Sequence, residues 1–307
     1  MDWTVLQHSD FYAGILRTAT PLSLAALGGV ITERSGVVNI GLEGMMLIGA
    51  FFGAWVANSS GNPWIGLLAA MFFGALIALI HGVLSITFRA DQIISGVAIN
   101  LVGTGLTGFL YETYAQNGFP SRPSIPDLKI PLIADIPGLG PVIGSQNGIV
   151  YIMLVLVIGA NFLLFYTTIG LRIRAVGEQP RAADTVGINV FFIRYLCVTL
   201  SGALAGLGGA YLSLGLVQNF TIGMSSGQGF IALAAMIVGK WTPFGALAAC
   251  LLFGFGQQIQ TSGLVTPGFA GNMVTIAPYL ITLIAVGGFV GRAVPPAADG
   301  VPYDPAK

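Results

Sequence analysis

The chain has 307 residues, of which 55% are hydrophobic and only 8% are charged. A soluble globular chain carries about 25% charged residues, so this chain has too few charges to cover a surface that faces water. Twelve basic residues balance twelve acidic ones, and the formal net charge is zero. Nucleic acid is excluded as a partner, because binding to phosphates requires clustered basic side chains. The composition indicates an all-α, polytopic membrane protein.

Four long stretches contain no Asp, Glu, Lys or Arg: Gly44–Phe88, Ile136–Leu171, Tyr195–Gly239 and Trp241–Gly291. A helix needs about 20 apolar residues to cross a bilayer core about 30 Å thick. We therefore predict about nine membrane helices, some of them broken or half-length: Phe11–Val30, Val38–Asn58, Trp64–Phe88, Gln92–Tyr114, Gly148–Thr168, Phe191–Leu216, Gln228–Gly239, Phe244–Ser262 and Met273–Val290. The seventh is too short to cross alone at about 1.5 Å per residue, unless it extends into residues 222–227.

The spans form one transmembrane domain, residues 1–294. The proline-rich end that follows, residues 295–307, is expected to be a flexible cytoplasmic tail. Residues 115–147 hold six prolines, which argue against a helix and for a structured cap outside the membrane. Nine of the twelve basic residues fall in loops on one side, which the positive-inside rule assigns to the cytoplasm. This arrangement places the N-terminus and the 115–147 loop outside. It places the 171–190 loop and the C-terminus inside.

The segment ERSGVVNIGLEG, residues 33–44, alternates charged and polar residues with glycines at membrane depth. A charge there costs at least about 2.5–3.5 kcal/mol, and it persists where it is paired or lines a wet cavity. Asn39 and Glu43 are four residues apart and share one helical face. We expect both to line a solute pathway, with Asn100 in the fourth span as a further candidate. The alternative is structural: the charges of the segment pair with one another in a turn, and Asn100 ties two helices together.

No pattern in the sequence predicts catalysis. Only two histidines occur, and no metal-binding, nucleophile or P-loop motif is present. We therefore expect no enzymatic activity, no metal and no cofactor. Any energy for uphill transport must then come from a partner. A self-contained carrier that uses Glu43 as its proton site is the alternative.

The 171–190 loop contains a short candidate helix outside the membrane, from Pro180 to Val186. Proline is favoured at the first helical position, and Gly187 supplies a stop. A short helix with small residues on one side suits docking into a groove on a cytosolic protein. An ordinary connecting loop is the alternative.

Four stretches, residues 25–46, 92–100, 177–187 and 230–241, make the chain resemble the permease subunits of bacterial ABC importers. The resemblance is to the branched-chain amino acid, ribose and nucleoside group, and within it to the smaller permease of nucleoside importers. RSGVVNIGLEG, residues 34–44, is its most specific part. The resemblance implies inward transport of nucleosides or related purine and pyrimidine compounds across the bacterial cytoplasmic (inner) membrane. A permease for another small solute, a sugar or an amino acid, is the alternative.

The resemblance also implies that the chain lies in membrane lipid and has three protein partners. They are a cytosolic ABC ATPase, a second permease subunit (a homologue or a second copy), and an extracytoplasmic solute-binding lipoprotein that meets the outer loop. The family's loop that contacts the ATPase matches a set of residues that we call the coupling set. Its members are Gly177, Glu178, Arg181, Ala182, Ala183 and Gly187.

Overall fold

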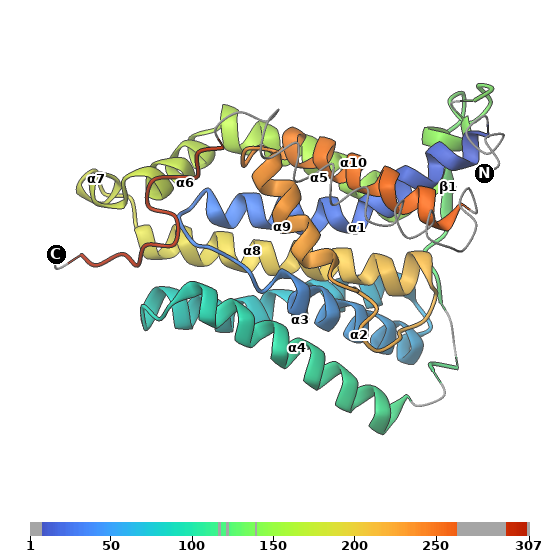
Figure 1. The fold of residues 1–307 in the computed structure, drawn as a ribbon, viewed down its shortest axis with the longest axis horizontal. Helices are drawn as coiled ribbons and strands as arrows, with labels where there is room; N and C mark the ends of the chain where they lie inside the picture. The colour runs from blue at the N-terminus through green and yellow to red at the C-terminus, as the bar shows by residue number, and fades with distance from the viewer. Residues whose placement is uncertain (1–7, 116–117, 121–122, 139, 263–292, 306–307) are drawn as a thin grey trace, which may run out of the picture.

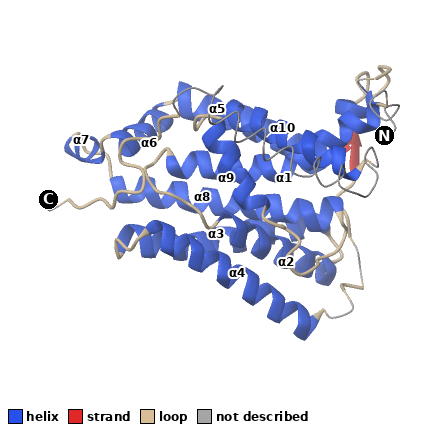
Figure 2. Cartoon of the chain, in the orientation of Figure 1, coloured by secondary structure: helices blue, strands red, loops and turns tan. Residues whose placement is uncertain are grey.

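The structure, a computed structural model, describes residues 8–115, 118–120, 123–138, 140–262 and 293–305. Within these ranges the chain is mostly helical, and its only sheet is a short antiparallel pair of strands (Figure 2). The strands, β1 (Asp127–Lys129) and β2 (Ser145–Asn147), lie in the proline-rich loop. The predicted all-α membrane fold is confirmed.

Ten α-helices occur in the described part of the chain (Figure 1). They are α1 (Ser9–Glu33), α2 (Leu42–Ser60), α3 (Pro63–Gly82), α4 (Gln92–Tyr114), α5 (Gly148–Tyr166), α6 (Thr168–Glu178), α7 (Pro180–Thr185), α8 (Val190–Ala210), α9 (Gln228–Val238) and α10 (Pro243–Thr261). Short π-helices continue α3 over Val83–Thr87 and α8 over Tyr211–Leu216, and a third covers Gly140–Gly144.

Five of these helices are long and apolar enough to cross a membrane: α1, α3 and α8 (the last two with their π-helical continuations), α4 and α5. Helices α2 and α10 have 19 residues each, a length of about 28 Å. Helix α9 has only 11 residues and does not extend into residues 222–227, so of the two alternatives for the seventh span the structure shows the half-length helix. The ninth predicted span, Met273–Val290, lies outside the described residues. The total of nine membrane helices therefore stays a prediction.

Polar residues set where several helices begin. The side-chain oxygens of Asn62, Asp91, Asn147, Asn189 and Thr242 each accept a hydrogen bond from a backbone amide in the first turn of the next helix. Such caps satisfy amides that have no partner inside the helix. The chain can therefore turn sharply between long apolar helices.

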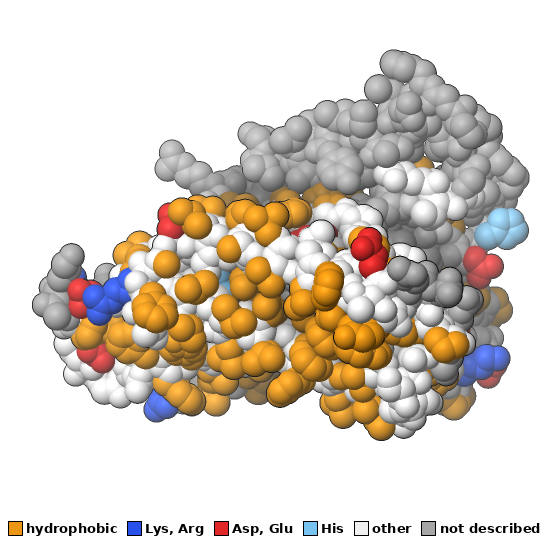
Figure 3. Space-filling model, turned by 90° about the horizontal axis from the view of Figure 1, so that it is seen from below, with side chains coloured by type: hydrophobic (Ala, Val, Ile, Leu, Met, Phe, Trp, Pro, Cys, Tyr) orange, Lys and Arg blue, Asp and Glu red, His pale blue; other side chains and the backbone are white. Residues whose placement is uncertain are grey.

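Glycines allow α8 to pack closely against α2 and α3 at the centre of the bundle. A β-carbon on Gly49 of α2 would collide with the backbone of Gly206, and one on Gly74 of α3 would collide with the backbone of Gly202. Small residues at such positions let membrane helices approach closely. On the outside, hydrophobic side chains are spread widely over the described part of the face shown in Figure 3, and most of its charged side chains lie toward the two ends.

The 171–190 segment differs from the predicted loop, because α6 occupies its first part. Thr167 has an extended backbone and separates α5 from α6. Its side-chain oxygen caps α6 by accepting a hydrogen bond from Gly170 N. The segment is therefore a helix, a turn and a second helix, α7. It lies at the end of the molecule opposite the N-terminus and β1 (Figure 1).

Residues 293–305, which include most of the predicted tail 295–307, pack along the α6–α7 end of the molecule, while the flexibility expected of the tail stays a prediction. Side-chain and backbone contacts hold this segment, among them Ala297 N to Glu178 Oε2 at 3.1 Å, Ala298 N to Gly177 O at 2.9 Å, Arg194 Nη1 to Val301 O at 3.0 Å, Tyr303 Oη to Asp184 Oδ2 at 2.8 Å, and an Arg89–Asp304 ion pair at 2.8 Å. Prolines leave the segment with few amide donors of its own, and residues 297–300 form a turn. Its amides, carbonyls and side chains bind partners on α6, α7, α8 and the α3–α4 turn.

Candidate functional site

The carboxylate of Glu43 binds the start of the half-length helix α9. Its Oε1 accepts hydrogen bonds from Ser225 Oγ at 2.5 Å and Gly227 N at 2.8 Å, and its Oε2 accepts one from Gly229 N at 2.7 Å. A helix N-terminus exposes amides without partners and carries a partial positive charge. A buried carboxylate at this place is thereby stabilised.

The opposite end of α9 is held by the start of the same 33–44 segment. Glu33 Oε2 accepts a hydrogen bond from Trp241 Nε1 at 2.6 Å, and Arg34 Nε donates to Trp241 O at 2.8 Å. Lys240 and Trp241 both have left-handed backbone angles, with φ of 55° and 52°. Side chains from residues 33–44 therefore bind both ends of α9. We call these contacts the α9 clamp.

The three predicted pathway residues lie together around the start of α2, and their polar groups have protein partners. Asn39 is fully buried, donates to Ser201 Oγ at 2.9 Å and accepts from Gly41 N at 3.1 Å. Asn100 accepts from Gly44 N at 2.8 Å and donates to Ile40 O at 2.9 Å. Each of the two asparagines therefore connects neighbouring elements through its side chain. For Asn100 this agrees with the alternative reading of the sequence, in which Asn100 ties two helices together. Contact of these residues with a solute stays a prediction.

The structural alternative, in which Glu33, Arg34 and Glu43 pair with one another in a turn, takes a different form. Each of the three binds α9 or a turn that flanks it. An eleven-residue helix cannot reach across a bilayer, so both of its ends lie among protein groups and need partners there. Charges in this segment therefore persist at membrane depth because they satisfy the ends of a short helix.

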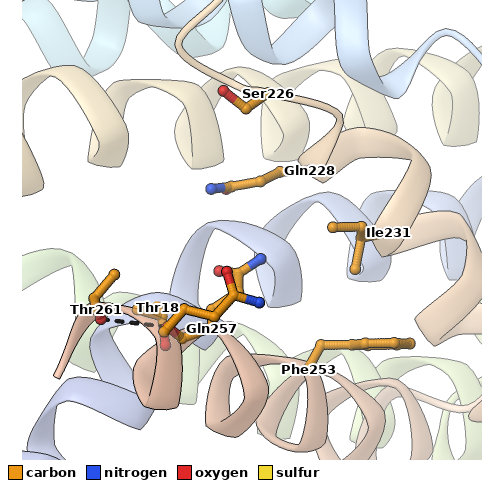
Figure 4. Close-up of a pocket in the computed structure, with 8 residues that line it drawn as sticks. Thr18, Ser226, Gln228, Ile231, Phe253, Gln257 and Thr261 are labelled. Carbon is orange, nitrogen blue, oxygen red and sulfur yellow. Dashed lines mark hydrogen bonds between the residues drawn. The ribbon is translucent and has the colours of Figure 1, made fainter. Parts of the chain in front are cut away.

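A cavity of about 330 Å³ lies between α1, α9 and α10 (Figure 4). Its lining is formed by Thr18, Ser226, Gln228, Ile231, Phe253, Gln257, Gln260 and Thr261. None of these side chains is charged, and six carry an amide or a hydroxyl group. Figure 4 shows the Gln228 side chain extending from the start of α9 into the open space, with Gln257 on the other side of that space. The cavity therefore offers neutral hydrogen-bonding groups beside an apolar wall.

The α9 clamp and the cavity share one helix. Gln228 and Ile231, two lining residues, lie in the first turn of α9, next to Gly227 and Gly229, whose amides bind Glu43. The carboxylate thereby fixes the position of one wall of the cavity. No group of three or more His, Cys, Asp or Glu residues in the described part of the chain is arranged to hold a metal ion.

The coupling set divides into buried and exposed members. Gly177 and Ala183 are buried, and a β-carbon on Gly177 would collide with the backbone of Arg34. The other four members, Glu178, Arg181, Ala182 and Gly187, are exposed. Gly187 has a φ of 83° and follows α7, in agreement with its predicted role as a stop. Only the exposed members are accessible to a partner.

The sequence interpretation missed the cavity. Gln257 and Gln260 are three residues apart and therefore share one face of α10, in a stretch without charges. That spacing of amides in an apolar helix was the available signal. It was overlooked because neutral polar side chains stand out less than charged ones in a membrane segment.

A family model described as "Branched-chain amino acid transport system / permease component" matches residues 11–286. The guanosine ABC transporter permease protein NupQ of Bacillus subtilis is 48% identical, with 94% of both chains covered. The nucleoside ABC transporter permease protein NupC of Lactococcus lactis is 41% identical over 96% of both chains. The putative glucose ABC transporter permease protein TsgC13 of Haloferax volcanii is 39% identical over 82% of this chain and 78% of its own.

Proposed function

The chain belongs to the family of permease components of branched-chain amino acid transport systems, and on this premise we propose that it is the membrane subunit of a nucleoside importer. In this proposal the chain carries nucleosides or related purine and pyrimidine compounds inward across the cytoplasmic membrane. ATP hydrolysis by a separate ATPase drives the movement, and the chain itself is no enzyme.

Similarity over the whole chain to two permeases named for guanosine and for nucleosides carries this proposal. The neutral lining of the cavity is compatible with it, since nucleosides are uncharged solutes rich in hydrogen-bonding groups. A phosphorylated solute would instead call for basic side chains. A sugar stays the alternative solute, in view of the similarity to a putative glucose permease.

We infer the same partners that the resemblance implies. The exposed surface of α7, with Arg181, Ala182 and Val186, supports docking of a cytosolic ATPase at that end of the molecule. The loop with β1 and β2 lies at the other end, where a solute-binding lipoprotein would approach from outside. A second permease subunit, a homologue or a second copy, completes the pathway.

The contacts of Glu43 disfavour the rival hypothesis of a self-contained proton carrier. Three donors already bind its two oxygens, so the charge is well satisfied where it lies. A proton site must lose and regain its charge during each cycle. That requirement is hard to meet for a carboxylate whose hydrogen bonds keep the start of α9 in place.

Uptake into proteoliposomes tests the proposal. The permease is reconstituted with its ATPase, second permease and binding lipoprotein, and uptake of radiolabelled guanosine is measured. We expect uptake with ATP, and none with an ATPase variant that cannot hydrolyse ATP. Guanosine uptake by this chain alone under a proton gradient would contradict the proposal. So would ATP-driven uptake of glucose without uptake of any nucleoside.

A further inference from the structure

We propose that the cavity between α1, α9 and α10 is a solute-binding subsite of the transport pathway, and that its glutamines recognise the base of a nucleoside. This inference rests on the proposed function and adds the site and the chemistry of recognition. It differs from the expectation that Asn39, Glu43 and Asn100 contact the solute. Those side chains bind protein groups, whereas the cavity provides space.

The size and lining of the cavity suit a small planar solute. Its volume of about 330 Å³ lies at the lower end of the range for small-molecule pockets, about 300–1,000 Å³. Phe253 supplies an aromatic ring at the wall, and Ile231 supplies an aliphatic surface. Aromatic side chains bind nucleobases by stacking, without strong preference for one base. A pathway needs such tolerance, because a solute that is held too tightly cannot leave.

The carboxamides supply the directional part of recognition. Each glutamine offers an acceptor oxygen and donor hydrogens side by side. This pair matches the adjacent donor and acceptor on a base edge, as glutamine does when it binds adenine in DNA. Two of the lining glutamines, Gln228 and Gln257, face the cavity from two helices. A base between α9 and α10 would therefore be within reach of amides from both sides.

The hydroxyl groups of the lining are oriented by the backbone. Thr18 Oγ1 lies 3.0 Å from the carbonyl oxygen of Gly254, and Thr261 Oγ1 lies 3.3 Å from that of Gln257. Ser226 Oγ lies 3.3 Å from the carbonyl oxygen of Gly223. Each hydroxyl donates its one hydrogen to a carbonyl, so its oxygen stays available as an acceptor. Ribose hydroxyls and ring N–H groups, which donate, fit these acceptors.

An independent observation points to a ligand at Gln228. Its Oε1 is shielded from solvent and has no hydrogen-bond partner among the described residues. A buried acceptor without a donor is unfavourable, so such atoms in native proteins usually bind a water or a ligand. A rotation of the side chain that turns this oxygen into the cavity would let a donor on the solute satisfy it.

Replacing glutamines with leucine tests the subsite. In the reconstituted transporter, we expect Gln228→Leu and Gln257→Leu each to raise the KM for guanosine about three- to tenfold, as for the loss of one neutral hydrogen bond. The turnover at saturating guanosine and the thermal midpoint should stay near those of the unchanged protein. Gln258→Leu is the matched control, because Gln258 lies on the same helix but packs against Gly14 of α1.

Direct binding supplies a second readout. The purified permease in nanodiscs is titrated with guanosine, and both cavity variants should bind it about three- to tenfold more weakly than the Gln258→Leu control. If both variants bind and transport guanosine as the control does, the subsite is wrong while the proposed function stands. If the unchanged transporter carries no nucleoside at all, the proposed function fails first.

Discussion

Glu43 shows how one buried side chain can determine the position of a helix that forms one wall of the cavity. Its carboxylate accepts three hydrogen bonds around the start of α9, two of them from backbone amides. A hydrogen bond to a charged group contributes about 1.5–3 kcal/mol, more than a bond between neutral groups. Because α9 also carries Gln228, loss of this carboxylate should disturb the cavity as well as the fold.

Glu43→Gln tests this role. An amide keeps one acceptor oxygen but turns an NH2 group toward a donor, so we expect a loss of about 1.5–3 kcal/mol in stability. The measurement is the thermal midpoint of the purified permease, together with its amount in the membrane. Glu112→Gln is the control, since Glu112 is exposed on α4. A stable Glu43→Gln variant with altered solute preference would favour direct contact of Glu43 with the solute instead.

Asp299 predicts that the packing of the tail depends on pH. Burial raises the pKa of Asp299 to about 7, while hydrogen bonds with Glu33 and the Gly300 amide and the charge of Arg194 oppose this rise. An unfolded aspartate has a pKa of about 3.9, so between pH of about 4 and 7 only the folded state keeps the proton. Stability from this group should therefore fall as the pH rises through that window.

Asp299→Asn should remove this pH dependence. An asparagine stays neutral at every pH, so the variant should have a higher thermal midpoint than the unchanged protein at pH 8, with a smaller difference at pH 5. Midpoints measured from pH 5 to 8 check this. Asp135→Asn serves as control, because Asp135 is exposed. Parallel curves for the unchanged protein and Asp299→Asn would contradict the assignment.

At the scale of elements, helix α7 shows that neighbouring positions can have opposite environments. Ala182 is exposed, whereas Ala183 is 2% exposed and packs into the core. A glutamate at 182 should therefore weaken ATPase docking and uptake without affecting folding. A glutamate at 183 would bury an unpaired charge, at a cost of about 3–5 kcal/mol, and should reduce the amount of folded protein.

Single variants separate docking from folding. The measurements are the affinity of the detergent-purified permease for its ATPase and its monodisperse yield. We expect Ala182→Glu to lose affinity at normal yield, and Ala183→Glu to lose yield. Normal ATP-driven uptake by Ala182→Glu would show that α7 does not carry the coupling.

The elements were predictable to different degrees, for physical reasons. Long apolar stretches predicted eight described helices, because only a helix satisfies its own backbone in lipid. Helix α6 was missed because Arg172 and Arg174 made its sequence look like a loop. The packed tail was missed because its stability comes from distant partners such as Arg194 and Asp184. The cavity was missed because α1, which supplies Thr18, lies far along the chain from α9 and α10, so no local pattern in the sequence brings the lining together.

At the scale of the whole molecule, the two ends carry different chemistry. Helices α6 and α7 and the tail gather at one end, and β1, β2 and the N-terminus lie at the other (Figure 1). The basic residues predict that the α7 end faces the cytoplasm. The cavity includes the start of α9 and the C-terminal part of α10. In the proposed function, a partner docked at α7 would therefore act on the cavity through the helices that lie between them. One of these is α1, whose last residue, Glu33, belongs to the α9 clamp.

Labelling of single cysteines tests the predicted orientation. Lys129 and Thr185 are exposed at opposite ends of the molecule, and the natural Cys197 and Cys250 are fully buried and should not react. In spheroplasts, a membrane-impermeant maleimide should label Lys129→Cys but not Thr185→Cys, and permeabilised cells should label both. The reverse pattern in spheroplasts would place α7 outside. It would remove α7 as the site of ATPase docking, because no ATP-hydrolysing partner could reach it there.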